Sequence, residues 1–98
     1  MRWHHGAPNY DSASQLEMEF SYVYILQSRT CPDSYYIGLT DNLADRLKRH
    51  NAGEMIHTSK LRPWRIKTAV AFTDRIRAAA FERYLKSASG RAFAKKRL

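Results

Sequence analysis

The chain alternates short apolar, aromatic-rich runs with longer amphipathic stretches. Residues 20–26 are dense in β-branched and aromatic side chains, which predicts a strand. Within this run Tyr22, Tyr24 and Leu26 fall on one face, and the two residues between them fall on the other. Both faces are apolar, so we expect the strand to be at least partly buried on both sides.

Two further strands are expected, one of them paired with the first in a hairpin. Residues 27–33 contain Pro32 and polar neighbours, which indicates a hairpin loop, and residues 34–38 form a strand that ends at Gly38. Residues 64–72 alternate large apolar residues with small or charged ones. That pattern predicts a third strand with one solvated face.

The first helix is predicted over residues 42–50. Thr40 and Asp41 are the candidate N-caps, because short oxygen-bearing side chains accept hydrogen bonds from the free N–H groups of a first turn. Gly53 is a natural stop. The basic and polar residues 54–63 are then expected to form a loop.

Two helices are predicted after the third strand. Thr73 or Asp74 caps the longer one, which extends to about Ser87, and Ser89-Gly90 separates it from a short basic helix that ends near the C-terminus. The predicted order is therefore β-β-α-β-α-α. This order is typical of an α+β fold with a three-stranded antiparallel sheet flanked by helices.

The 98 residues allow one folded domain, predicted to span residues 20–98. Residues 1–19 lack a periodic apolar pattern and are expected to form a mobile N-terminal extension. No apolar run approaches the ~20 residues that span a bilayer, which argues against a membrane protein. A single cysteine, Cys31, excludes an intramolecular disulfide and favours the reducing cytoplasm.

The charge is strongly positive, with 17 Lys and Arg against nine Asp and Glu and a formal net charge of +8. Sixteen of the basic residues but only six of the acidic ones lie from Tyr22 onward, which gives that part a charge of +10. Such an excess attracts a polyanion. It also serves solubility, but abundant arginine together with 12% aromatic residues favours nucleic acid as the partner.

The first helix carries two residues with possible chemistry on its buried stripe. On a helical wheel Arg46 and His50 fall in the same sector as Leu43 and Leu47. A partly buried guanidinium needs a partner: Arg46 either pairs with an interior carboxylate or carbonyl, or borders a cleft and binds a phosphate. His50 either interacts with the helix dipole or serves the site.

Glu82 is the only acidic residue after Asp74 and is surrounded by basic residues. It either forms an ordinary pair with Lys86, worth only ~0.2–0.5 kcal/mol, or anchors a divalent ion in a basic cleft. Tyrosines on the two hairpin strands are equally ambiguous, being either core residues with wet hydroxyls or part of a site. Alternation and pairing could bring Tyr36 close to Tyr24, and a phenol acting as a base needs positive charge nearby.

Together these segments resemble the GIY-YIG nuclease family, in particular its compact, standalone bacterial branch, which is similar to the N-terminal nuclease domain of the excision-repair nuclease. The resemblance covers roughly residues 20–98 and depends on the order and spacing of several motifs. These motifs are Tyr22-Val-Tyr24, Tyr36-Ile-Gly38, the helix segment 41–51, Pro63-Trp64 and the helix segment 81–86.

The resemblance implies an α+β phosphodiesterase that uses one metal ion. Tyr24 matches the tyrosine that acts as general base for the attacking water, and Tyr36 matches the one that positions the water or the scissile phosphate. Arg46 matches the arginine that stabilises the transition state. Glu82 matches the sole carboxylate ligand of Mg²⁺ or Mn²⁺.

The resemblance also implies residues that bind substrate. Gly38 keeps the backbone close to the site, and His50 falls where many members carry a histidine near the substrate. Arg49 and Lys60 are expected to bind the nucleic-acid backbone. The expected activity is metal-dependent endonucleolytic cleavage of DNA rather than RNA, in repair or in the processing of structured DNA.

Three departures from the family pattern keep other functions open. Tyr22 replaces the leading glycine of the first motif, and no asparagine follows Asn51, although many catalytic members have a late one. No second DNA-binding domain is recognised, so a protein partner is expected to supply specificity. The alternatives are a non-catalytic nucleic-acid-binding module that retains the nuclease fold, and an interaction partner of a larger repair complex.

Overall fold

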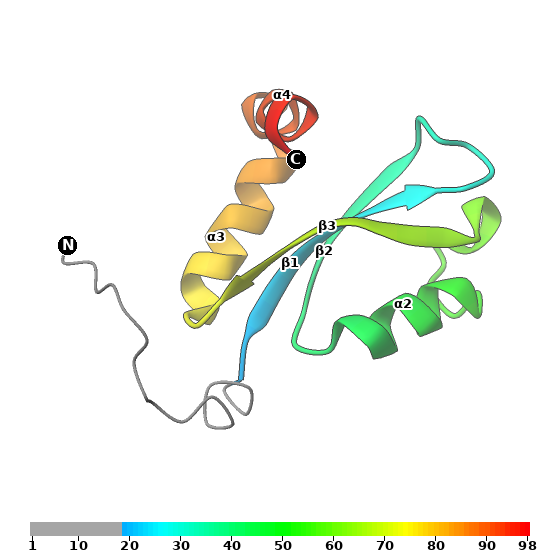
Figure 1. Cartoon of the computed structure of the whole chain (residues 1–98), viewed down its shortest axis with the longest axis horizontal. Helices are drawn as coiled ribbons and strands as arrows, with labels where there is room; N and C mark the ends of the chain where they lie inside the picture. The colour runs from blue at the N-terminus through cyan, green and yellow to red at the C-terminus, as the bar shows by residue number, and fades with distance from the viewer. Residues whose placement is uncertain (1–18) are drawn as a thin grey trace, which may run out of the picture.

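Three strands form one antiparallel sheet in the order β2-β1-β3 (Figure 1). Their bounds are β1 Ser21–Ser28, β2 Tyr35–Thr40 and β3 Trp64–Phe72. The computed structural model describes residues 19–98. The predicted N-terminal extension, except for Glu19, lies outside the described residues.

Helices cover both faces of the sheet (Figure 1). Helix α2, Leu43–Asn51, lies on one face, while α3, Arg75–Lys86, and α4, Ala88–Arg97, lie on the other. The predicted order β-β-α-β-α-α is confirmed, and so is the α+β class. The expected loop after α2 contains a single turn of 3-10 helix, η1, Ser59–Leu61. No helix within residues 19–98 is both long and apolar enough to cross a bilayer.

Alternation along β1 divides the core into two layers. Val23 and Ile25 face α3 and pack against Ala78 and Leu85, whereas Tyr24 and Leu26 face α2. Since successive strand residues point to opposite faces, a strand between two helical layers must be apolar on both. This confirms the sequence-based expectation for β1, and it fixes Tyr24 on the side of α2.

The cap of α2 differs from the prediction. Asn42 is the N-cap, and its side-chain oxygen accepts a hydrogen bond from the Asp45 N–H at 3.0 Å. The hydroxyl of Thr40 instead accepts from the Asn42 N–H at 3.1 Å, which holds the turn before the helix. Thr40 and Asp41 therefore precede the cap. For α3 the predicted cap Asp74 is confirmed, with its carboxylate accepting from the Ile76 N–H at 2.9 Å.

The break between the last two helices lies at Ser87, so the prediction of a separator at Ser89-Gly90 is wrong. Ser87 ends α3, and its hydroxyl oxygen accepts from the Gly90 N–H at 3.1 Å as the N-cap of α4. Gly90 lies in the first turn of α4, buried against α3. A Cβ there would overlap the carbonyl of Tyr84. The glycine allows close contact between helices rather than acting as a linker.

Candidate active site

Strand pairing brings the hairpin tyrosines together. Tyr24 of β1 lies directly opposite Gly38 of β2, and Tyr36 lies two residues before Gly38 on the same face. A Cβ at position 38 would overlap the Tyr24 phenol. Gly38 therefore makes room for the Tyr24 ring over β2, and the centroids of the Tyr24 and Tyr36 rings lie 6.3 Å apart.

His50, in the last turn of α2, connects Tyr24 to the loop that follows the helix. Its Nε2 lies 3.0 Å from the Tyr24 hydroxyl, and its Nδ1 lies 2.7 Å from the Thr58 hydroxyl. All three side chains are buried, with relative exposures of 0–1%. The Tyr36 ring packs edge-on against the imidazole, with their centroids 4.9 Å apart. His50 thus contacts both tyrosines that the sequence singled out.

The burial of His50 lowers its pKa, and the positive charge of Arg46 lowers it further. The imidazole is therefore neutral at physiological pH. Both ring nitrogens of His50 bond to buried side chains, so the imidazole lies within the Tyr24–Thr58 cluster. Its role in the site stays a prediction.

The hydrogen-bond network favours one tautomer of His50. The positive charge of Arg46 acts on Tyr24, and the Thr58 hydroxyl donates to the Met55 carbonyl at 3.4 Å. Thr58 then accepts from the Nδ1–H of His50, which leaves Nε2 with its lone pair. Tyr24 donates its O–H to that nitrogen.

The pKa of Tyr24 responds to the three other predicted catalytic residues. Burial raises this pKa above its ordinary value, and the Arg46 guanidinium opposes the rise as a hydrogen-bond donor. The neighbouring Tyr36 and the negative charge of Glu82 raise it further. Residues from β1, β2, α2 and α3 therefore all act on one phenol, which holds its proton at neutral pH.

Of the two sequence-based interpretations of Glu82, the structure shows the pair with Lys86. The carboxylate lies 3.4 Å from the Lys86 ammonium, as expected of an i,i+4 pair, and its side chain is 20% exposed. Its charge nevertheless reaches Tyr24 on β1. For Arg46, none of the ion pairs among the described residues includes its guanidinium, which is half-buried and acts on Tyr24 and His50 instead.

The donor set fits a hard divalent cation that is only partly held by protein. Within residues 19–98 no group of three His, Cys, Asp or Glu side chains could enclose a metal ion. Mg²⁺ often takes only one or two carboxylates and completes its shell with water and substrate phosphate oxygens. The partly exposed carboxylate of Glu82 satisfies that requirement.

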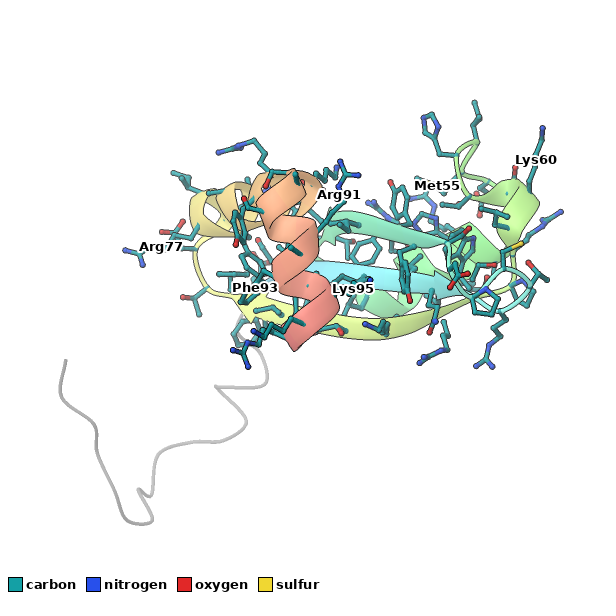
Figure 2. All side chains as sticks on the ribbon, turned by 90° about the horizontal axis from the view of Figure 1, so that it is seen from above. Met55, Lys60, Arg77, Arg91, Phe93 and Lys95 are labelled. Atoms are coloured by element: carbon teal, nitrogen blue, oxygen red, sulfur yellow. The ribbon has the colours of Figure 1, made fainter. Side chains whose placement is uncertain are left out.

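Two predicted substrate-binding residues lie outside this cluster. Arg49 is exposed on α2 and lies 4.0 Å from the Glu54 carboxylate. Lys60 is exposed in η1, at the opposite end of the molecule from Arg77 (Figure 2). Their roles toward substrate stay predictions.

Sequence reasoning missed Thr58, because a threonine in a polar loop carries no local sign that it will be buried. The loop is held in place by Trp64, whose indole N–H donates to the Thr58 carbonyl at 2.8 Å. Asn51, at the end of α2, bonds to both the N–H and the carbonyl of Trp64, at 2.6 and 3.0 Å. This bracing orients the Thr58 hydroxyl toward His50.

This fold and this cluster define the class of the protein. Residues 20–97 match the GIY-YIG catalytic domain, so the chain belongs to the GIY-YIG nuclease family. The match spans the same part of the chain as the predicted domain. It confirms the resemblance recognised from the motifs.

Two curated yeast proteins are similar to this chain, and both are named structure-specific endonuclease subunit SLX1. The protein of Meyerozyma guilliermondii is 41% identical over 75 residues, which is 69% of this chain and 25% of the relative. That of Scheffersomyces stipitis is 40% identical over 67 residues, 61% of this chain and 20% of the relative. The chain thus spans a quarter or less of their length. The expected likeness to the bacterial branch stays a prediction.

Proposed function

We propose that the protein is an endonuclease that hydrolyses phosphodiester bonds in structured DNA. Membership of the GIY-YIG family supports nuclease activity, and the names of the yeast relatives support a structured DNA substrate. The observation that carries the proposal is the cluster of Tyr24, Tyr36 and His50, in which the buried Tyr24 hydroxyl lies 3.0 Å from the imidazole. An unspecialised core tyrosine has no need of that arrangement.

Tyr24 serves as the base, with His50 as its proton acceptor. Because the phenol is protonated at neutral pH, it can take a proton from water only if it gives up its own. The neutral Nε2 of His50, 3.0 Å away, is placed to receive it. The water proton moves to the Tyr24 oxygen and the phenol proton moves to His50, while the water oxygen attacks phosphorus.

Arg46 and Tyr36 act on the phosphate. The P–O bond to the leaving sugar oxygen breaks, and that oxygen takes a proton from solvent. The Arg46 guanidinium, already beside Tyr24, stabilises the charge that develops on the phosphoryl oxygens. Tyr36 positions the phosphate or the water from the adjacent strand.

Glu82 would hold one Mg²⁺ or Mn²⁺. When bound, such an ion supplies Lewis-acid stabilisation of the phosphate and of the leaving oxygen. The carboxylate also pairs with Lys86, a weak and partly exposed interaction.

The proposal includes a protein partner that supplies specificity. The yeast relatives are named as subunits, so those proteins work within an assembly. In the proposed mechanism the active-site residues act on the phosphate, and none of them is assigned to read bases. We therefore propose that the partner helps to select the DNA structure that is cut.

The test is a nicking assay over branched, nicked and single-stranded substrates, with Mg²⁺, Mn²⁺ or EDTA. Tyr24→Phe retains the ring and removes the base, so we expect a loss of roughly 10²- to 10⁴-fold. Arg46→Ala should lose roughly 10²- to 10³-fold. Glu82→Ala should abolish the stimulation by metal.

Matched controls come from the same elements. Tyr22→Phe, on the same strand and face as Tyr24, and Glu54→Ala should cut as the parent protein does. Cutting that persists in both Arg46→Ala and Glu82→Ala would defeat the assignment. A protein that binds DNA but fails to cut with either metal would instead be the non-catalytic module, which the absence of an asparagine after Asn51 favours.

A further inference from the structure

A hollow of about 690 Å³ lies on the face of the sheet opposite α2, between the hairpin strands and α4. Ile25, Ile37 and Ala94 line its apolar part. Its volume falls within the ~300–1,000 Å³ range of pockets that enclose small ligands. The candidate active site described above does not account for this hollow.

Four cationic side chains surround the hollow, against a single acid, Asp33; they are Lys67, Lys86, Arg91 and Lys95. The guanidinium of Arg91 is held by two hydrogen bonds to the Lys86 carbonyl, at 3.2 and 3.0 Å. Figure 2 shows Arg91 and Lys95 on one side of α4, with Phe93 on the other. Positive charges around a concave surface concentrate the field and attract an anionic ligand.

Tyr35 gives the hollow an aromatic wall. The ring is 51% exposed, and the ammonium of Lys67 lies over it, 5.5 Å from the centroid. Lys67 has no partner in the β1–β3 register, because the pairing shifts by one residue beside it. Such a bulge re-aims a side chain. An exposed ring beside cations is the surface on which unpaired bases stack.

The hollow and the candidate active site lie on opposite faces of the sheet but share two residues. Tyr36 lines the hollow and also packs against His50, with ring centroids 4.9 Å apart. Lys86 lines the hollow and also pairs with Glu82. Because β2 is an edge strand, a DNA strand bound at the active site can reach the hollow around that edge.

We propose that this hollow binds an unpaired nucleotide of the DNA strand that occupies the active site, with its base on Tyr35 and its phosphate among the lysines. That the same strand also occupies the active site rests on the proposed function. Only a single strand suits this surface, because the bases of a duplex are stacked on each other and offer no free face to a tyrosine.

The experiment measures binding of a short fluorescent oligothymidylate by the full chain in EDTA, using anisotropy, with the oligonucleotide checked for integrity on a gel. Removing a stacking ring in Tyr35→Ala should raise the Kd roughly 5- to 100-fold. Lys95→Ala should weaken binding and reduce the slope of log K against log salt by about 0.7.

The controls are Ile76→Ala, which removes another exposed apolar side chain, and Lys96→Ala, the next residue on α4; neither lines the hollow. Both should bind like the parent protein, and circular dichroism should show all four variants folded. Unchanged affinity in Tyr35→Ala, or equal losses in the controls, would overturn the proposal. An equal loss of affinity of Tyr35→Ala for a blunt duplex would also overturn it. Failure of the parent protein to nick DNA would overturn the proposed function alone, since this binding needs no cleavage.

Discussion

Burial gives His50 and Tyr24 properties that neither has in water. Both are almost completely excluded from solvent, and each satisfies its polar atoms through the other and through Thr58. Burial raises the pKa of the phenol and lowers that of the imidazole, so the pair is held uncharged at neutral pH. A neutral pair can pass a proton along its own hydrogen bond without first exposing a charge.

The lowered pKa of His50 predicts acid sensitivity. An unfolded chain protonates this histidine near its ordinary pKa of about 6.5, whereas the folded protein does so only at lower pH. The unfolded state therefore binds more protons as the pH falls below about 6.5, and the unfolding equilibrium should shift by up to about tenfold per pH unit. Thermal unfolding of the parent protein between pH 7.5 and 5.5 measures this effect.

Two variants separate His50 from other titrating groups. His50→Gln should show a flatter pH dependence, relative to its own stability at pH 7.5. His57→Gln, which replaces an exposed histidine, should follow the parent protein. Equal slopes in His50→Gln and the parent would contradict the prediction.

At the scale of elements, the junction between α3 and α4 is a packed contact. Ser87 ends one helix and caps the next, and Gly90 brings the first turn of α4 against the Tyr84 carbonyl. The aromatic rings of Phe81, Tyr84 and Phe93 continue the contact between the two helices, with centroid spacings of 6.4 and 6.0 Å. The junction holds α4 in the position where Arg91 and Lys95 line the hollow.

This packing predicts the outcome of Gly90→Ala. At an unpacked break between two helices, an alanine would be neutral or would stabilise the fold. In the packed junction the added methyl overlaps a backbone carbonyl, and overpacking of this kind costs about 1–3 kcal/mol. Chemical denaturation should show that loss in Gly90→Ala, while Ser89→Ala stays within about 0.5 kcal/mol of the parent. A Gly90→Ala variant more stable than the parent would contradict the close packing of α3 and α4 at Gly90.

At the scale of the whole molecule, the positive charge is distributed over both ends. Lys60 and Arg77 lie at opposite ends in Figure 2, and Arg91 and Lys95 line the hollow on α4. Affinity for DNA therefore depends on which of these cations contact phosphate and release counterions. Net charge alone does not identify them.

Salt dependence identifies which end contacts phosphate. If Lys60 binds substrate, as we expect from the sequence, Lys60→Ala should reduce the slope of log K against log salt by about one. Arg77→Ala should leave the slope unchanged, since Arg77 pairs with Asp74 at 3.7 Å at the other end. Titration of a labelled branched duplex over a range of salt gives both slopes. If Arg77→Ala reduced the slope and Lys60→Ala did not, the DNA would instead be bound at the end of the molecule that contains α3.

The local pattern of residues predicted the order of the elements, though not the α2 cap or the α3–α4 break, and supplied the site candidates apart from Thr58. Strand alternation placed Tyr24 and Val23 on opposite faces, and the spacing of the motifs singled out Arg46 and Glu82. Those inferences succeed because side-chain direction along a helix or strand depends only on the residue's position in its own element. The family assignment follows from the same short-range spacings.

Tertiary structure alone decided how the candidates meet. The bond of His50 to Thr58, the close approach at Gly90, and the hollow shared by Tyr36 and Lys86 all join segments that no local spacing relates. The assignment of the α2 cap failed for a related reason, since Thr40 and Asn42 are equally good caps until the turn between them is fixed. Contacts between distant elements depend on how whole elements pack, and burial then sets the pKa values on which the proposed chemistry depends.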